Sequence, residues 1–289
     1  MRLVSYQYKG VDSVGIVAGD EVVDIPANLP HAPNSIKAIF AEGDSMLAEI
    51  RQLAESGKGS RVKLSDVSLL APISDPQKYL AIGMNYQDHA EEVRAKGIAI
   101  PKSQLWFNKQ VSCITGPYDP IVYPRVSNKL DYEAELGVVI GRRCRYVSEE
   151  DARDVIAGYF VANDVSARDW QAASPTFTLG KSFDTHGPIG PWIVTADEVE
   201  NPHDLDMRLY VNGEIRQQTN TSGMIYNIWQ QISYLSQVMT LEPGDLIATG
   251  TCANVGMATG KLLNIGDVVK VEIEGIGSIE NTVIADTAQ

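Results

Sequence analysis

The 289-residue sequence has little of what marks membrane, extracellular or nucleic-acid-binding proteins. No apolar run approaches the roughly 18 residues that a membrane-spanning helix needs, and the N-terminus lacks the apolar core of a signal peptide. The three cysteines are an odd number without metal-ligand spacing, which favours free thiols in a reducing compartment. Lys and Arg number 24 against 37 Asp and Glu, and the net charge of −13 argues against binding to phosphate backbones or anionic membranes. We therefore expect a cytoplasmic protein without a nucleic-acid or membrane partner.

Signatures of several common enzyme classes are also missing. The glycine-bounded segment 180–188 is neither a P-loop nor a dinucleotide-binding pattern, and the sequence contains no Gly-x-Ser-x-Gly nucleophile elbow. It has four histidines but no Cys/His cluster for zinc. Strands and helices do not alternate along the chain. The sequence therefore disfavours a serine hydrolase, a zinc site and a doubly wound parallel sheet.

The pattern of short apolar segments predicts a mostly β protein of the α+β class. Residues 1–70 form a small β-rich unit with helical periodicity over 35–57, which Gly43-Asp44 can split into two helices. Residues 71–289 are dense in short strands and have few helices, with helical patterns over 85–96 and, most clearly, over 224–239. Asn212-Gly213 between apolar runs predicts a β-hairpin. We expect two domains that meet near residue 70.

The acidic segment 131–140 is the most informative part of the sequence. Glu133 and Glu135 stand two positions apart before an apolar run, so on a strand they point to one face and repel unless a cation lies between them. Asp164 ends a second apolar strand, a common place for site residues. Three carboxylates with water form the oxygen ligand set that Mg²⁺ or Mn²⁺ prefers. The alternatives are a solvated strand face and an ordinary turn-forming aspartate.

Other polar residues are candidates for catalysis or substrate binding, each with a plainer alternative. His89 and Glu92 stand three apart on a predicted helix, where the carboxylate can orient the imidazole as a general base; an exposed polar helix is the alternative. Lys181, in segment 180–188, can bind a carboxylate or stabilise an enolate, or it is a surface lysine. Thr251 follows an apolar strand in a Thr-Gly-Thr turn that can bind a carboxylate; an ordinary turn is the alternative.

Five motifs between residues 83 and 251 resemble, in order, those of the fumarylacetoacetate hydrolase family. The motifs are Gly83-Met84-Asn85-Tyr86-x-x-His89, Asp131-Tyr132-Glu133-Ala134-Glu135-Leu136, Asn163-Asp164-Val165-Ser166-Ala167-Arg168-Asp169, Gly180-Lys181-Ser182-Phe183-Asp184 and Thr249-Gly250-Thr251. Residues 1–70 are similar to the small N-terminal domain of the family's bacterial two-domain branch. Cys252 stands where the family often has proline, and Asn254 adds a polar group, a departure that bears on the substrate rather than on the metal site.

The resemblance implies a mixed β-roll catalytic domain over residues 71–289, behind a β-rich N-terminal domain over residues 1–70. It also implies a homodimer or a higher homo-oligomer, and Mg²⁺ or Mn²⁺ as cofactor. The implied roles are metal ligation by Glu133, Glu135 and Asp164, water activation by His89 and Glu92, a place in the pocket for Lys181, and substrate contacts for Arg168, Gln171 and Thr251.

The reaction that the resemblance implies is hydrolysis of a C–C bond in a 2,4-dioxo acid. An acylpyruvate or a 2,4-diketo-3-deoxy sugar acid would give pyruvate and a carboxylic acid. Decarboxylation of oxaloacetate, isomerisation and a lyase reaction remain alternatives, because they use the same chelate or enolate. A non-enzymatic scaffold is disfavoured, since it predicts loss of at least one residue of the metal set or the His–Glu pair, and all five are present.

Overall fold

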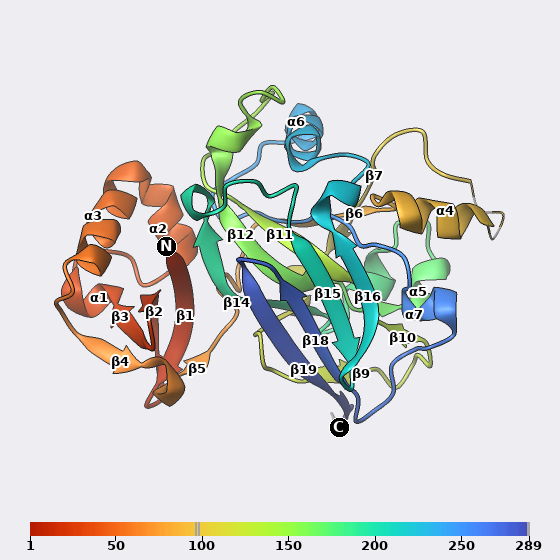
Figure 1. Ribbon diagram of the computed structural model, residues 1–289, viewed down its shortest axis with the longest axis horizontal. Coiled ribbons are helices and arrows are strands. Elements are labelled where there is room, and N and C mark those ends of the chain that lie inside the picture. Colours follow the sequence, from red (N-terminus) through yellow and green to blue (C-terminus); the bar gives the residue numbers. More distant parts are fainter. Residues whose placement is uncertain (96, 98, 288–289) are drawn as a thin grey trace.

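The computed structural model describes residues 1–95, 97 and 99–287 (Figure 1). The strands are β1 (Arg2–Tyr8), β2 (Val11–Ala18), β3 (Glu21–Asp24), β4 (Arg61–Lys63), β5 (Ser68–Leu69), β6 (Tyr79–Gly83), β7 (Leu105–Lys109), β8 (Ile114–Thr115), β9 (Ile121–Tyr123), β10 (Leu130–Asp131), β11 (Ala134–Ile140), β12 (Ile156–Asn163), β13 (Ser166–Ala167), β14 (Gly187–Thr195), β15 (Asp206–Val211), β16 (Glu214–Asn220), β17 (Leu246–Ala248), β18 (Val268–Ile273) and β19 (Gly277–Ala285). The α-helices are α1 (Ile25–Asn28), α2 (Ile36–Glu42), α3 (Asp44–Glu55), α4 (Gln87–Ala95), α5 (Arg168–Ala172), α6 (Ile228–Val238) and α7 (Gly256–Thr259).

Within the described residues, one large mixed sheet runs through the molecule. Its main path is β4-β3-β2-β1-β14-β12-β11-β17-β6-β7, with β5 on β1 and β8 on β14. A smaller sheet has the order β16-β15-β18-β19-β9, and β10 pairs with β13. This arrangement confirms the prediction of a mostly β protein of the α+β class and contains no doubly wound sheet.

The strand β11 lies near the middle of the large sheet and is buried throughout its length. Alternate side chains point to opposite faces of a strand, so Leu136 and Val138 join one apolar core while Val139 joins another. Gly137 is needed here, because a Cβ at this position would lie 2.3 Å from the ring of Phe160 on β12. Packing on both faces fixes the strand that carries Glu135 and that follows directly after Glu133.

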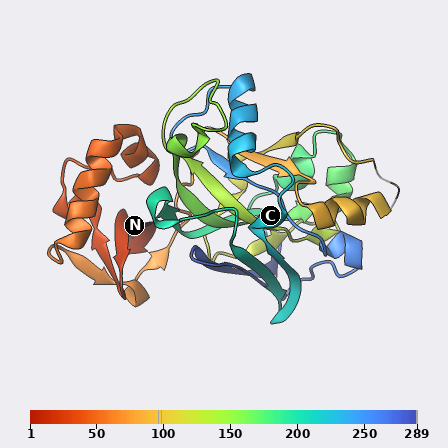
Figure 2. The same ribbon diagram turned by 45° about the horizontal axis from the view of Figure 1, so that its top comes forward.

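The N-terminal unit packs at one end of the molecule, and α4 lies at the opposite end (Figures 1 and 2). The strand β1 of the N-terminal unit pairs with β14 at two positions, Arg2 with Val194 and Leu3 with Ile193, so the large sheet continues across both parts of the chain. The expected boundary near residue 70 falls in the strand-free stretch between β5 and β6. The division into two domains at that point stays a prediction.

Several local predictions are confirmed, with small shifts at the element ends. Asn212-Gly213 connects β15 and β16 as a hairpin. The helical stripe over 35–57 is split at Gly43 into α2 and α3. The helix α6 begins at Ile228, after the predicted residue 224, because Asn227 caps it and forms a capping box with Gln230. The helix predicted over 85–96 is α4, and residue 96 lies outside the described residues.

Candidate metal centre and substrate pocket

The three acidic residues converge because β11 and β12 are antiparallel neighbours. Their register pairs Ala134 with Asn163, so Asp164 follows directly and donates its N–H to the Glu133 carbonyl at 2.9 Å. Glu133 precedes β11 rather than lying on it, which corrects the expectation that both glutamates are strand residues. One ligand oxygen from each of Glu133, Glu135 and Asp164 lies within 4.8 Å of the others, and all three residues are buried.

Buried cations compensate two of these carboxylates. Lys181 Nζ lies 2.7 Å from Glu133 Oε2 and 2.7 Å from Asp164 Oδ2. Arg168 Nη1 donates to Glu133 Oε1 at 2.6 Å, and Lys109 Nζ donates to Asp164 Oδ1 at 2.6 Å. Lys109 also donates to the carbonyls of Lys181 and His186, so all three of its protons are used. The two carboxylates are therefore paired with buried cations and held in fixed orientations.

Glu135 differs, because no lysine, arginine or histidine of the described residues forms an ion pair with it. Its Oε2 accepts one hydrogen bond, from the Gly250 N–H at 2.7 Å. Burial and the neighbouring charges of Asp164 and Glu133 raise the pKa of Glu135 well above its ordinary value. Burial also raises the pKa of Glu133, but Lys181 and Arg168 outweigh it and lower that pKa to about 2. A buried carboxylate without its own cation, beside two others, fits a hard divalent cation bound by oxygen.

The predicted His–Glu pair is formed on α4. His89 Nδ1 lies 3.0 Å from Glu92 Oε2. The Asn254 N–H donates to the second oxygen, Glu92 Oε1, at 3.2 Å, which ties α4 to the loop after Thr251. A positive charge on the His89 ring would also lower the pKa of Glu133, by less than Lys181 and Arg168 do, while burial raises it. The pair therefore lies within electrostatic reach of Glu133.

The predicted substrate contacts lie on two segments beside the cluster. Arg168 Nη1 also donates to Gln171 Oε1 at 2.9 Å, and its Nη2 is buried without a hydrogen-bond partner among the described residues. Thr251 Oγ1 accepts a hydrogen bond from Gln217 Nε2 at 3.0 Å. A buried guanidinium nitrogen without an acceptor suits the carboxylate of a small acid.

Sequence reasoning missed three buried residues that support this site. Lys109 shares a strand face with Phe107, and this period-2 spacing was the one available signal that it is buried and needs a carboxylate. Gln217, on β16, also accepts from the Ala134 N–H at 2.9 Å, and no local pattern marks it. Asp131 is the first residue of the acidic motif, but the sequence did not indicate its contact with Arg168, whose Nε donates to Asp131 Oδ2 at 2.7 Å.

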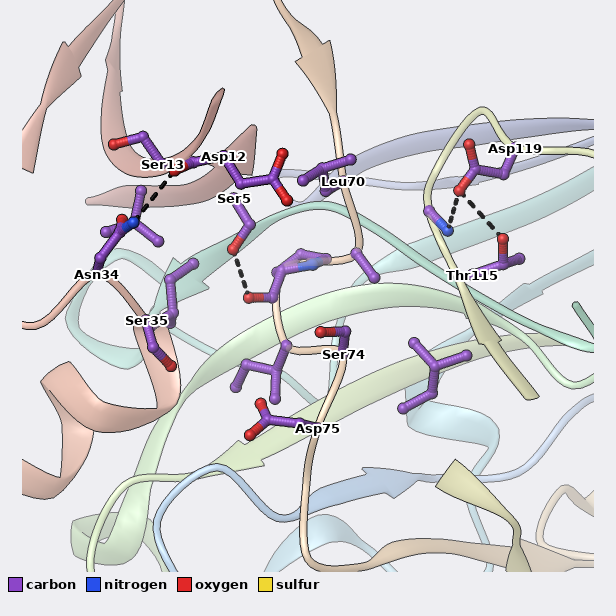
Figure 3. A pocket seen from close by; sticks show the side chains of 17 residues that line it. Ser5, Asp12, Ser13, Asn34, Ser35, Leu70, Ser74, Asp75, Thr115 and Asp119 are labelled. Carbon is purple, nitrogen blue, oxygen red and sulfur yellow. Dashed lines mark hydrogen bonds between the residues drawn. The ribbon is translucent and has the colours of Figure 1, made fainter. Parts of the chain in front are cut away.

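A cavity of about 510 Å³ lies elsewhere, between the N-terminal unit and the loops after β5 and β8 (Figure 3). None of the predicted site residues lines it. Ser5 Oγ donates to the Pro72 carbonyl at 2.8 Å, and Asp119 Oδ2 accepts from Thr115 and from the Gly116 N–H. These polar groups are bound to each other, and the acidic cluster is the better candidate for chemistry.

The sequence pattern of the family described as fumarylacetoacetate (FAA) hydrolase, C-terminal, matches residues 78–284. The chain belongs to this family. The matched range contains the carboxylate cluster, the His–Glu pair and every other predicted site residue. The resemblance that the five motifs indicated is thereby confirmed, and with it the family's fold.

The similarity to known proteins extends over almost the whole chain. An oxaloacetate tautomerase, named as mitochondrial, from Xenopus laevis is 40% identical over 292 residues, which cover 98% of this chain and 90% of the relative. The structure of maleylpyruvate hydrolase from Sphingobium sp. SYK-6 with manganese(II) and pyruvate is 34% identical, with a TM-score of 0.83 and coverage of 99% and 100%. The structure of 5-carboxymethyl-2-hydroxymuconate delta-isomerase from Mycobacterium smegmatis is 34% identical, with a TM-score of 0.79 and coverage of 100% of both chains.

These relatives place the chain in an enzyme family that includes tautomerases, hydrolases and isomerases. A manganese-bound relative and the cluster of acidic side chains both fit a divalent metal. Among residues 1–95, 97 and 99–287, no helix is long and apolar enough to cross a bilayer.

Proposed function

We propose that the protein is a divalent-metal-dependent enzyme that interconverts the keto and enol forms of a small 2-oxo acid of the oxaloacetate type. The observation that carries this proposal is the buried cluster Glu133, Glu135 and Asp164, in which Glu135 has no cation of its own in the described structure. The similarity of nearly the whole chain to an oxaloacetate tautomerase supports the choice of reaction.

A bound Mg²⁺ or Mn²⁺ would supply Lewis-acid polarisation of the 2-oxo group and stabilise negative charge on its oxygen. Arg168 Nη2 would bind a substrate carboxylate, since it is buried and has no acceptor among the residues that the structure describes. Lys181 would hold a second positive charge beside the reacting group. These residues fix the acid with its oxo group toward the carboxylate cluster.

The proton transfer falls to His89. In the neutral tautomer that donates its Nδ1 proton to Glu92, Nε2 is the unprotonated nitrogen that can act as the base. In the keto-to-enol direction, Nε2 takes a proton from carbon 3 and returns it to the oxygen on carbon 2, so the atoms of the substrate are conserved and His89 ends in its starting state. The reverse steps return the keto form.

Hydrolysis of a 2,4-dioxo acid, either an acylpyruvate or a 2,4-diketo-3-deoxy sugar acid, is the second candidate. The manganese- and pyruvate-bound maleylpyruvate hydrolase favours it. In this reaction His89 Nε2 takes a proton from a water whose oxygen attacks the carbonyl at carbon 4. The bond between carbons 3 and 4 then breaks, and His89 passes the proton to carbon 3, which gives pyruvate and a carboxylic acid. Decarboxylation of oxaloacetate would use the same binding groups without the water.

Product analysis separates these reactions. Chelator-treated protein receives Mg²⁺ or Mn²⁺ and then oxaloacetate or a panel of 2,4-dioxo acids, while the ultraviolet enol band and the products are followed. A tautomerase speeds the approach of the enol band to equilibrium and leaves the total oxaloacetate unchanged. Pyruvate with a carboxylic acid indicates the hydrolase, and carbon dioxide from oxaloacetate indicates the decarboxylase. If none of these acids changes faster than in a Glu135→Gln control, the proposed function is wrong.

A homodimer or higher homo-oligomer remains part of the proposal. Light scattering of the purified protein gives its mass in solution, and a mass of one 31.5 kDa chain would contradict it.

A further inference from the structure

Asp131 is a buried carboxylate that the proposed reaction does not use. It lies two residues before Glu133 and has no exposed surface. Its Oδ1 accepts from the N–H groups of Tyr132 at 2.8 Å and Gly256 at 2.7 Å. Its Oδ2 accepts from the Met257 N–H at 2.8 Å and from Arg168 Nε at 2.7 Å. One side chain therefore joins the guanidinium of a predicted substrate contact to the start of α7.

The chain is shaped to allow this junction. The pairing of β10 with β13 places Asp131 opposite Ser166, and the Arg168 N–H donates to the Lys129 carbonyl at 2.9 Å. Gly256 must be glycine, because a Cβ there would lie 2.4 Å from Asp131 Oδ1 and 2.7 Å from the Lys261 carbonyl. Backbone register brings the carboxylate to Arg168, and the missing side chain at 256 lets α7 approach it.

The junction leaves one part of Arg168 available. Nε binds Asp131, and Nη1 binds Glu133 and Gln171, whereas Nη2 is buried without a partner in the described structure. A guanidinium is planar, so fixing Nε and Nη1 also fixes the direction of Nη2. The segment that enters α7 also carries Asn254, whose N–H binds Glu92 of the His–Glu pair.

We propose that Asp131 is a positioning residue for the organic substrate. It aims Arg168 Nη2 at a carboxylate of the substrate and holds the loop after Thr251 against the same guanidinium. The 2-oxo acid in this inference rests on the proposed function. Asp131 acts on substrate binding through Arg168, and it contributes no ligand to the metal.

The test is Asp131→Asn. The amide nitrogen cannot accept hydrogen bonds, so donors that face it lose their acceptor whichever way the amide is oriented. We expect the KM for the 2-oxo acid to rise about 10- to 100-fold, the effect of one charge-assisted hydrogen bond. The Mn²⁺ dissociation constant, measured by electron paramagnetic resonance, and kcat should stay close to those of the wild type. A merely structural role would not separate KM from kcat and metal binding in this way.

Asp245→Asn is the matched control. Asp245 is equally buried and binds one cation, Lys78 Nζ at 2.7 Å, together with the backbone N–H groups of Lys78 and Glu242. None of its partners belongs to the site. This variant should lose stability in urea as Asp131→Asn does but keep the wild-type KM. Equal KM values in the two variants would overturn the inference, as would loss of Mn²⁺ binding in folded Asp131→Asn.

Gly256→Ala serves if Asp131→Asn does not fold, because the added methyl displaces the carboxylate without removing it. It should raise KM in the same direction, and an unchanged KM would overturn the inference. Calorimetric binding of the same 2-oxo acids to Mn²⁺-loaded wild type distinguishes failure of the proposed function from failure of the role proposed for Asp131. A wild type that neither binds nor converts them overturns the proposed function and this inference together, whereas a converting wild type with an insensitive Asp131→Asn overturns the inference alone.

Discussion

Replacing Glu135 by glutamine should stabilise the metal-free protein while it removes metal binding. Glu135 is buried beside two like charges, and ligand oxygens of the three carboxylates lie within 4.8 Å of one another. At that separation, one pair of like charges repels by about 3 kcal/mol with an effective dielectric constant of 20. Lys181 offsets part of this repulsion, so at a pH where Glu135 is ionised the expected gain for Glu135→Gln is on the order of 1–3 kcal/mol in free energy of unfolding.

The gain should depend on pH in a defined direction. Burial, Asp164 and Glu133 raise the pKa of Glu135 in the folded state, so the folded protein holds a proton there that the unfolded chain has lost. The free energy of unfolding of metal-free wild type therefore falls as the pH rises from the ordinary glutamate pKa, 4.5, through the folded pKa. The free energy of unfolding of Glu135→Gln should not fall in this way. The difference in free energy of unfolding between Glu135→Gln and the wild type should therefore grow toward alkaline pH.

Glu133→Gln is the matched control, and its effect should have the opposite sign. Despite burial, Lys181 and Arg168 lower the pKa of Glu133 from 4.5 to about 2. The ionised Glu133 carboxylate, paired with Lys181 and Arg168, therefore stabilises the folded state above pH 4.5, and this stabilisation is lost as the pH falls through 2. Glu133→Gln should therefore cost roughly 2–4 kcal/mol at neutral pH.

Urea denaturation of chelator-treated proteins at several pH values measures both effects, and calorimetry with Mn²⁺ measures the affinity. The reasoning is refuted if Glu135→Gln is less stable than the metal-free wild type at pH 8, or if it binds Mn²⁺ as tightly.

Three further predictions follow from the same contacts. Lys109→Met should lower the free energy of unfolding, measured with urea, by roughly 3–5 kcal/mol, because it leaves the Asp164 charge and two carbonyls short of a buried donor. Lys78→Met removes a partly exposed ion pair and should lower it clearly less. Equal losses in the two variants would contradict this prediction. His89→Gln should lower kcat by roughly 10²- to 10⁴-fold with unchanged Mn²⁺ affinity, and a kcat near wild type would remove His89 from the proton transfer. Mn²⁺ at about 100 times its dissociation constant should raise the free energy of unfolding of the wild type by about 3 kcal/mol, and an equal rise in Glu135→Gln would speak against the assigned ligands.

Local sequence patterns were enough for much of the fold and for the acidic cluster. The Asn212-Gly213 turn specifies a hairpin by its backbone preference, and the apolar run after Glu135 specifies a buried strand. Glu133 and Glu135 are separated by a single residue, and Asp164 follows the last residue of the neighbouring strand β12, so antiparallel pairing alone brings the three together. His89 and Glu92 lie within one helical turn. Each of these features depends on neighbours in the sequence or on one strand pairing.

The tertiary structure alone decided which buried groups compensate the carboxylates. Lys109 and Asp164 are 55 positions apart, Gly250 and Glu135 are 115 apart, and Asp131 meets Gly256 across 125. A lysine or a glycine carries no local mark of the carboxylate it will meet, because such a contact arises only when several strands pack around it. The sequence therefore determined which side chains could hold a cation. Packing determined that Glu133 and Asp164 already have cations while no described side chain supplies one to Glu135. This difference in buried charge is the physical basis of the proposed site.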